Sequence, residues 1–344
     1  MRHPAPLITG SCSIKSHLIC ILILTMAETA ALIGSGGAMR LFRNSTILLA
    51  ILFIALSLSG RAQTHTWTGA DPSGYWSAPA NWSPAGVPVN GNDLVFPGGL
   101  PPGDMLSTND LTDSTFRSIT FNQGSRYTIR GNPMTLTNRA NVIINDGTNV
   151  IACDLTFSGT PPLPTTGNPS IWSSSFGSTE LTVIGNVGGG NLKVAVGFGR
   201  VVIRGQFTGG SLFVDWYSTL ALYGDNPYAV SADIHSSKLL VQGSQPNLNI
   251  RMFYNMEDLT SSSLSGGGLV GDVTVVTGYG YITPDSTLSV KNLSLNPDVS
   301  QSVLDIHFNG TNVGEYGRLV ASGDVSLSSG RLFPSAGLDR KSVV

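Results

Sequence analysis

Four short apolar segments, each ending in glycine, recur at nearly constant intervals in the middle of the chain: Leu181–Gly185, Val201–Gly205, Leu220–Gly224 and Leu239–Gly243. The intervals between their glycines are 20, 19 and 19 residues. A unit of about 20 residues with short strands cannot enclose a core of its own, so it gains stability by stacking on similar units. The repeat therefore predicts a parallel β-solenoid in which the first residues of the four segments lie one above another.

A second strand is expected between members of this series, at Leu192–Val196, Leu212–Trp216 and Leu248–Ile250. Apolar and polar residues alternate in the repeat, which predicts an inward apolar column and a polar outside. Glycine suits the corners, where φ is positive or backbones crowd together. An antiparallel sandwich is the competing architecture, but it needs Asn-Gly or Asp-Gly hairpins, and residues 181–243 contain neither. The predicted fold class is all-β, a parallel β-helix (β-solenoid) with an irregular N-terminal cap.

The composition agrees with such a fold and excludes several classes of protein. Of the 344 residues 12% are charged and 41 are glycine, while 41% are hydrophobic, which is enough for a buried core. Helical bundles, coiled coils and basic nucleic-acid-binding domains are richer in charge. Residues 1–62 hold 5 of the 19 basic and 1 of the 21 acidic residues, which leaves 14 basic and 20 acidic residues beyond them. We therefore expect no nucleic-acid partner.

The region before residue 63 has the three-part layout of a secretory signal peptide. A cationic stretch at 39–43 precedes the nearly all-apolar residues 47–58, and small residues lead to a predicted cleavage between Ala62 and Gln63. An apolar helix of this length spans about 18 Å, short of the roughly 30 Å of a bilayer core. We therefore expect residues 39–62 to be a cleaved signal peptide and the mature chain to have no stable membrane span.

The remaining boundaries follow from shifts in composition. Residues 1–38 are expected to be non-native sequence from an over-long gene start, or else an extended leader or a two-helix anchor. Residues 63–159 are expected to form the N-terminal cap and the first irregular β rungs, because an uncovered first rung invites aggregation. Residues 160–170 are a Pro/Thr-rich loop, and 171–338 are the regular solenoid repeats. Residues 339–344 match one reading frame of a common sequencing adapter, so we expect an artefactual tail.

Four aromatic residues at the start of the mature chain are candidate binding residues: Trp67, Tyr75, Trp76 and Trp82. Exposed aromatic rings can stack on sugar rings, and exposed Trp often marks a binding surface. The alternative is that these side chains plug the open end of the solenoid as part of its cap. Trp216 and Tyr217, beside a predicted strand, are interpreted as packing or surface residues.

The sequence offers little support for catalysis. The mature chain has one cysteine, Cys153, in an apolar segment that suits a small buried residue. No metal-ligand, phosphate-binding or hydrolase motif is present. Asp215, Asp225 and Asp233 are the outward acids that a carboxylate cluster would use, but nothing in their spacing requires a shared face. We interpret them as solvated, and we expect no catalytic residue, no metal site and no cofactor.

An opening pattern precedes the repeats: Trp67-Thr-Gly-Ala70, Tyr75-Trp76, Asn81-Trp82, Pro88 and Asp93-Leu-Val-Phe96. Four segments later in the chain carry the rest of the pattern: Leu264–Gly268, Gly271–Val275, Ile282–Pro284 and Gly314–Val320. Over most of residues 63–333 the chain resembles bacterial autotransporter-associated β-strand repeat proteins. One departure is Ile282-Thr-Pro284, where Ala-Pro-Gly is commoner in that family.

The resemblance implies an exported β-helical passenger with a structural or adhesive role and no shared catalytic residues. Its expected location is the cell surface, the outer membrane or the extracellular space, and its expected partners are extracellular glycans or other cell-surface components. A C-terminal translocator or sorting tail, common after such passengers, is an expected missing part. The alternative function is that of a secreted carbohydrate-binding or polysaccharide-active β-helix protein.

Overall fold

The first residues of the four repeat segments, Leu181, Val201, Leu220 and Leu239, pair in register on neighbouring parallel strands of the computed structural model. All four side chains are fully buried. Their strands are β13 (Glu180–Val183), β16 (Arg200–Ile203), β18 (Thr219–Leu222) and β20 (Lys238–Val241). The predicted stacking is therefore confirmed, and so is the fold class, an all-β parallel β-solenoid.

The structure describes residues 62–99, 105–137, 142–158, 170–174, 177–228, 231–253, 261–278, 280–295, 302–308, 317–327 and 330–336. All of them belong to one unit, Ala62–Val344. The expected leader (1–38) and tail (339–344) lie outside the described residues, as do the expected signal peptide up to Arg61 and the Pro/Thr-rich loop up to residue 169.

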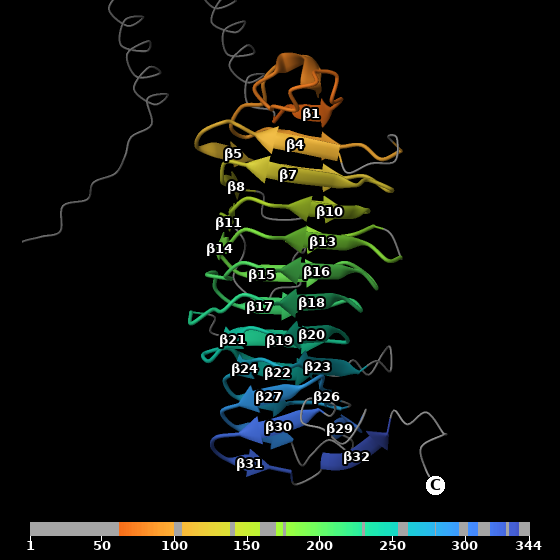
Figure 1. Cartoon of the computed structure of the whole chain (residues 1–344), viewed down its shortest axis with the longest axis vertical. Helices are drawn as coiled ribbons and strands as arrows, with labels where there is room; N and C mark the ends of the chain where they lie inside the picture. Colours follow the sequence, from red (N-terminus) through yellow and green to blue (C-terminus); the bar gives the residue numbers. More distant parts are fainter. Residues whose placement is uncertain are drawn as a thin grey trace, which may run out of the picture. The chain divides into compact units, whose positions relative to one another are not determined.

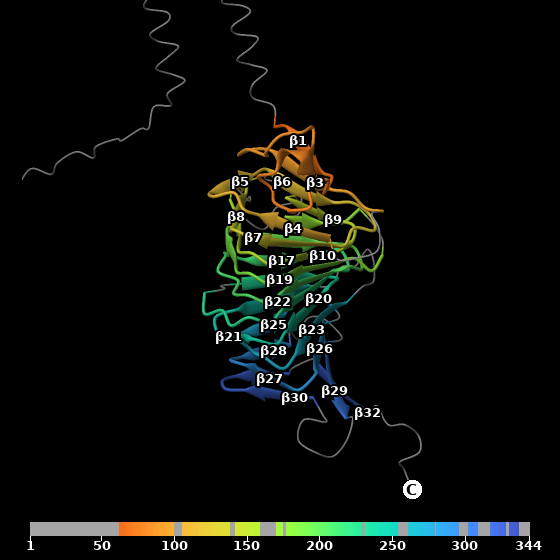
Figure 2. The same cartoon turned by 45° about the horizontal axis from the view of Figure 1, so that its top comes forward.

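Each turn of the solenoid passes through three faces, and strands of successive turns lie one above another (Figure 1, Figure 2). The first face is a 13-stranded sheet, named sheet A. Its strands, in spatial order, are β2 (Trp82–Ser83), β1 (Thr64–Trp67), β3 (Asp93–Phe96), β6 (Ser118–Phe121), β9 (Ile143–Asn145), β12 (Ile171–Trp172), β15 (Leu192–Ala195), β17 (Leu212–Val214), β19 (Ser231–His235), β22 (Asn249–Phe253), β25 (Val273–Val275), β28 (Leu293–Leu295) and β31 (Val325–Ser326).

The second face is an 11-stranded sheet, named sheet B, which contains the four strands of the glycine repeat. Its other strands are β4 (Met105–Asn109), β7 (Tyr127–Gly131), β10 (Thr148–Ile151), β23 (Ser262–Gly266), β26 (Gly280–Pro284), β29 (Ser302–Phe308) and β32 (Gly330–Ala336). Apolar side chains of sheets A and B alternate inward and form one continuous buried core.

The third face consists of two separate four-stranded sheets. Sheet C contains β5 (Ser114–Phe116), β8 (Met134–Leu136), β11 (Leu155–Phe157) and β14 (Val187–Gly189), and sheet D contains β21 (Ser244–Gln245), β24 (Leu269–Val270), β27 (Thr287–Val290) and β30 (Arg318–Ala321). Between them the turns carry buried Phe207, which bridges to Val187, and buried Asn226. The pairing breaks where the chain supplies Asn226-Pro227 in place of an alternating apolar segment, since proline cannot donate to a β ladder.

Strand β19 is one that the sequence repeat does not predict. Its Ala232 pairs with Leu212 on one side and with Ile250 on the other, so it lies between two strands that the repeat places next to each other. Asp233 therefore lies within a strand. The strand is hard to recognise because its inward positions are a small alanine and Ile234, which give weak alternation.

The repeated glycines form a column at the corner that follows sheet B. A methyl group on Gly205 would lie 2.3 Å from the carbonyl oxygen of Gly185, and one on Gly224 would lie 2.1 Å from that of Gly205. These distances are far shorter than van der Waals contact. Crowding between successive turns, and not a positive φ, therefore requires glycine at this corner.

The N-terminal end is covered by a small irregular unit. Strands β1 and β2 pair antiparallel, the one antiparallel pairing among the described strands, and a 3-10 turn, η1 (Pro79–Asn81), leads into β2. Parallel pairing already begins where β1 meets β3, so ordered rungs start well before the glycine repeat.

The described residues include no helix that is long and apolar enough to cross a bilayer.

Candidate binding surface on the outer face of sheet A

Three aromatic rings stack on the outer face of sheet A, on the neighbouring strands β17, β19 and β22. The ring of His235 lies 4.6 Å from that of Phe213 and 4.5 Å from that of Phe253, centroid to centroid, and both pairs are nearly parallel. These spacings are close to the roughly 4.8 Å between strands. Phe213 faces outward because its neighbours Leu212 and Val214 occupy the buried core. The sheet therefore carries a continuous aromatic stack on its outside.

Charged side chains flank this stack and are paired with one another. The Arg251 guanidinium donates from Nε and Nη2 to the two carboxylate oxygens of Asp233, over 2.8 and 2.6 Å. The Lys193 ammonium lies 3.9 Å from the carboxylate of Asp215 and 5.0 Å from the centroid of the Phe213 ring. The hydrogen bond to Asp233 raises the pKa of Arg251. We name Lys193, Phe213, Asp215, Asp233, His235, Arg251 and Phe253 the sheet A ladder; its charges cancel within the ladder.

A second aromatic group lies at the corner where the chain leaves sheet A for sheet B. The rings of Phe198 and Tyr217 lie 4.9 Å apart at an interplanar angle of 5°, and those of Trp172 and Trp216 lie 6.4 Å apart at 2°. Phe198 is 63% exposed, and the other three are partly exposed. We name these four residues the aromatic corner.

The backbone of this corner is in a conformation that large side chains rarely adopt. The φ angles of Phe198, Trp216 and Tyr217 are 53°, 60° and 58°. The left-handed region costs an L-residue about 1–2 kcal/mol, and such strain persists only where the surroundings enforce it. The neighbouring residue Gly197, with φ 39°, leaves space for the indole of Trp216, which would lie 3.3 Å from a methyl group there.

Buried serine hydroxyls enforce the turn. The backbone N–H of Val196 donates to Ser218 Oγ over 2.7 Å, and Ser218 Oγ donates to the carbonyl oxygen of Asp215 over 2.5 Å. The Ser218 N–H donates in turn to Ser237 Oγ of the next rung, over 3.1 Å. These bonds tie three successive turns together at the corner and hold the strained residues in place.

The three predicted outward acids do not form one cluster. Asp215 and Asp233 both lie on the outer side of sheet A, where each is paired with a basic side chain. Asp225 lies at the glycine corner instead, and its carboxylate accepts a hydrogen bond of 2.7 Å from the N–H of Ser244 on the next rung. The role of Asp225 in this structure is to cap a backbone donor.

The four aromatic residues that the sequence singles out near the N-terminus are mostly buried: Trp67, Trp76 and Trp82 at 2% exposure or less, against 49% for Tyr75. The indole N–H of Trp76 donates to Ser107 Oγ over 2.6 Å, and that of Trp82 donates to the carbonyl oxygen of Trp76 over 2.9 Å. Their rings pack on one another and on Phe96. Burial therefore places the three indoles in the cap and leaves Tyr75 as the one exposed ring of the four.

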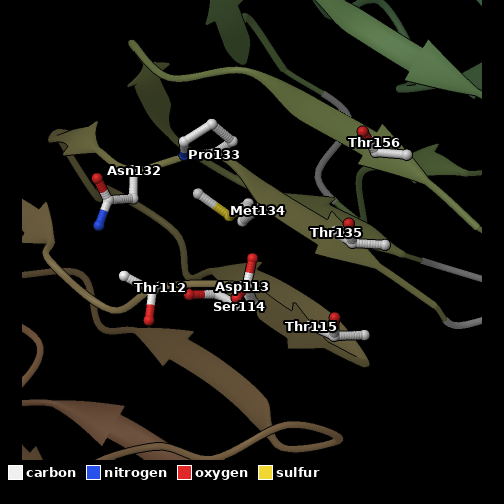
Figure 3. A pocket seen from close by; sticks show the side chains of 9 residues that line it. All are labelled: Thr112, Asp113, Ser114, Thr115, Asn132, Pro133, Met134, Thr135 and Thr156. Carbon is white, nitrogen blue, oxygen red and sulfur yellow. The ribbon is translucent and has the colours of Figure 1, made fainter.

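A shallow depression of about 460 Å³ lies on the outside of sheet C (Figure 3). Its lining residues are Thr112, Asp113, Ser114, Thr115, Asn132, Pro133, Met134, Thr135 and Thr156. Thr115, Thr135 and Thr156 pair in register on three successive strands and form a hydroxyl ladder. Asp113 is the single titratable group in the lining, so the depression offers hydrogen bonds but no acid–base pair.

Other reactive groups are few in the part of the chain that the structure describes. Cys153 is buried and unbonded, and burial raises the pKa of its thiol to about 12. Such a thiol is a poor nucleophile near neutral pH. Within the described ranges no three His, Cys, Asp or Glu side chains gather as metal ligands would.

Most of the surface described above is not signalled by the sequence repeat. From the sequence we predict that Asp215 and Asp233 are outward acids, and we interpret Trp216 and Tyr217 as packing or surface residues. It passes over the other aromatic members: Trp172, Phe198, Phe213, His235 and Phe253. The usable signal was an aromatic residue at an outward position of a strand, as in Leu212-Phe-Val214.

Comparison with known proteins found no matching family model, no matching curated protein and no matching solved structure.

Proposed function

We propose that this protein is an exported β-solenoid that serves as a non-catalytic, adhesive scaffold at a bacterial cell surface or outside the cell. We include in this proposal that the chain is related to the autotransporter-associated β-strand repeat proteins, which its sequence resembles. The observation that carries it is the aromatic stack of Phe213, His235 and Phe253, in which rings from three successive rungs contact one another on the outer side of sheet A. Weak contacts repeated along one rigid body add up through effective concentration.

The state of the carboxylates favours a binding role over a catalytic one. General acid–base catalysis needs groups that are free to exchange protons near the operating pH. The Asp233 carboxylate accepts hydrogen bonds from Nε and Nη2 of Arg251, and the Asp225 carboxylate accepts one from a backbone N–H. Carboxylates held in this way organise a surface, and they suit a scaffold.

The export part of the proposal rests on the signal-like segment 39–62 and has a direct test. The full gene is expressed in a Gram-negative host, and the mature N-terminus is determined by sequencing of the protein recovered outside the cytoplasm. We expect an N-terminus at Gln63. Retention in the cytoplasm with an uncut N-terminus contradicts export.

The adhesive part is tested on beads coated with the full chain. We expect the beads to be retained on immobilised mucin and on extracellular matrix from bacterial biofilm. Beads that carry the Leu220→Asp variant, which places a charge in the buried column, should lose this retention because the scaffold unfolds. Equal retention of both kinds of bead, or none of either, contradicts an adhesive role of the folded solenoid.

A further inference from the structure

We propose that the aromatic corner of Trp172, Phe198, Trp216 and Tyr217 is a binding site for a neutral polysaccharide chain, whose sugar rings stack on the aromatic faces. This inference rests on the proposed adhesive function and deepens it, because it assigns the contact to one site and to one class of ligand.

The strained backbone is the first argument for a binding role. Glycine satisfies a left-handed turn without strain, and the chain uses it next to Phe198, at Gly197. The chain nevertheless places large rings at three left-handed positions, and Phe198 recovers little by burial because it is 63% exposed. Backbone strain of this kind clusters at functional sites. The exposed ring of Phe198 is therefore better explained by what it contacts from outside.

The arrangement of the rings is the second argument. Phe198 and Tyr217 are parallel and 4.9 Å apart, so they lie on successive rungs as one stack. Phe198 is covered by Tyr217 on one side, and its exposed fraction leaves most of the remaining ring surface open to solvent. A sugar ring has one face of C–H groups and a rim of hydroxyls. Its C–H face fits the electron-rich face of an aromatic ring, and its rim remains in water.

The neighbouring charges are the third argument, because they select the class of ligand. Asp215 lies directly before Trp216 in the sequence, and its carboxylate pairs with the ammonium of Lys193 over 3.9 Å. The carboxylate can accept a hydrogen bond from a sugar hydroxyl, and the ammonium can donate one to it. Because they cancel in charge, they create no field that would attract the phosphates of nucleic acids or anionic lipids, which bind to clustered Lys and Arg. Among polymers that stack on aromatic rings, a neutral polysaccharide fits best.

The test is affinity electrophoresis of the full chain in native gels that contain xylan, mixed-linkage β-glucan, galactomannan or dextran, with polyuridylate as an anionic stacking probe. The variants are Phe198→Gly and Tyr217→Asn, both of which suit a left-handed backbone. The matched control is Tyr228→Ala, which removes a ring that is 66% exposed and lies outside the corner. Thermal unfolding midpoints are measured for every variant, so that a loss of fold is recognised.

We expect at least one neutral polysaccharide to retard the parent protein. Phe198→Gly and Tyr217→Asn should each weaken that binding by about ten-fold or more, as for a central aromatic contact. Their unfolding midpoints should stay level or rise, because backbone strain is relieved. Tyr228→Ala should bind like the parent.

Three results overturn the inference: no retardation by any of the four polysaccharides, unchanged binding by both corner variants, or tighter binding of polyuridylate than of every polysaccharide. The bead experiment separates this inference from the proposed function. If both corner variants bind polysaccharide like the parent in the gels while the parent's beads adhere, the polysaccharide site is wrong and the adhesive role stands. If the parent binds a polysaccharide but its beads do not adhere, the adhesive role is wrong and the site stands.

Discussion

The imidazole ring of His235 lies 4.6 Å from the ring of Phe213 and is tilted by 22° from it, on the neighbouring strand of sheet A. Burial in this stack lowers the pKa of His235 from its ordinary value of 6.5. The imidazole of His235 therefore binds a proton less tightly in the folded protein than in the unfolded chain. As the pH falls below about 6.5, the unfolded chain binds more protons, and the free energy of unfolding must fall with it.

The charges around His235 act in both directions. The carboxylates of Asp215 and Asp233 raise its pKa, and the cations of Lys193 and Arg251 lower it. Because each acid pairs with one of the cations, their effects offset each other, and burial is the largest cause. The direction of the pH dependence therefore follows from burial in the stack.

The variant His235→Phe keeps a ring in the stack and removes the titration. We expect the parent to lose stability between about pH 7.5 and 5.5, by no more than about 1.4 kcal/mol per pH unit for one proton. The variant should lose less over the same range, in urea unfolding followed by circular dichroism. Burial also lowers the pKa of His65 in the cap, so a smaller slope should remain until His65 is replaced too. Identical slopes for the parent and His235→Phe contradict the prediction.

The glycine column predicts a sharp difference between two chemically identical substitutions. In Gly205→Ala the new methyl group would lie 2.3 Å from the carbonyl oxygen of Gly185, so the turns must separate. We expect this variant to lose about 1–3 kcal/mol of stability, the usual cost of overpacking. Gly177→Ala is the control, because a methyl group there meets nothing within 4 Å. It should stay within about 0.5 kcal/mol of the parent. Equal unfolding midpoints for the two variants would show that this corner is not crowded.

The cap predicts that Trp76 is a folding residue. Its indole is fully buried and donates to Ser107 Oγ over 2.6 Å. Trp76→Ala should therefore cost about 3–5 kcal/mol, as other buried tryptophans do. Tyr75→Ala, at a neighbouring and 49% exposed position, should change stability by less than about 0.5 kcal/mol. A Trp76→Ala variant as stable as the parent would mean that the cap does not depend on this packing.

The buried thiol of Cys153 predicts protection from alkylation. With a pKa of about 12, almost none of it is thiolate at pH 8, and the core blocks access to it. We expect iodoacetamide to label the Cys153 peptide slowly in the native protein and at the rate of a free thiol in 8 M urea. Mass spectrometry of the tryptic peptide measures the labelling of this site. Fast labelling in native buffer contradicts a closed core at this rung.

The stacking axis of the protein could be predicted from its sequence alone. Glycines at a spacing of 19 or 20 residues, each after an alternating apolar segment, admit few structures besides a pile of rungs, since one rung has no core. The alignment of Leu181, Val201, Leu220 and Leu239 follows directly from that period. The period is a property of the local sequence, and it does not depend on tertiary contacts.

The tertiary structure decided which residues lie side by side on the surface. Strand β19 escapes the sequence pattern because Ala232 gives it a weak apolar signal, and without β19 the stack of Phe213, His235 and Phe253 cannot be foreseen. The same holds for Phe198 and Tyr217, which are 19 positions apart in the sequence and 4.9 Å apart in space. Burial of the cap tryptophans and exposure of Phe198 likewise depend on how neighbouring turns cover each side chain. The sequence determined the repeat, but pairing across turns and solvent exposure are properties of the assembled solenoid, because each depends on contacts between residues one turn or more apart.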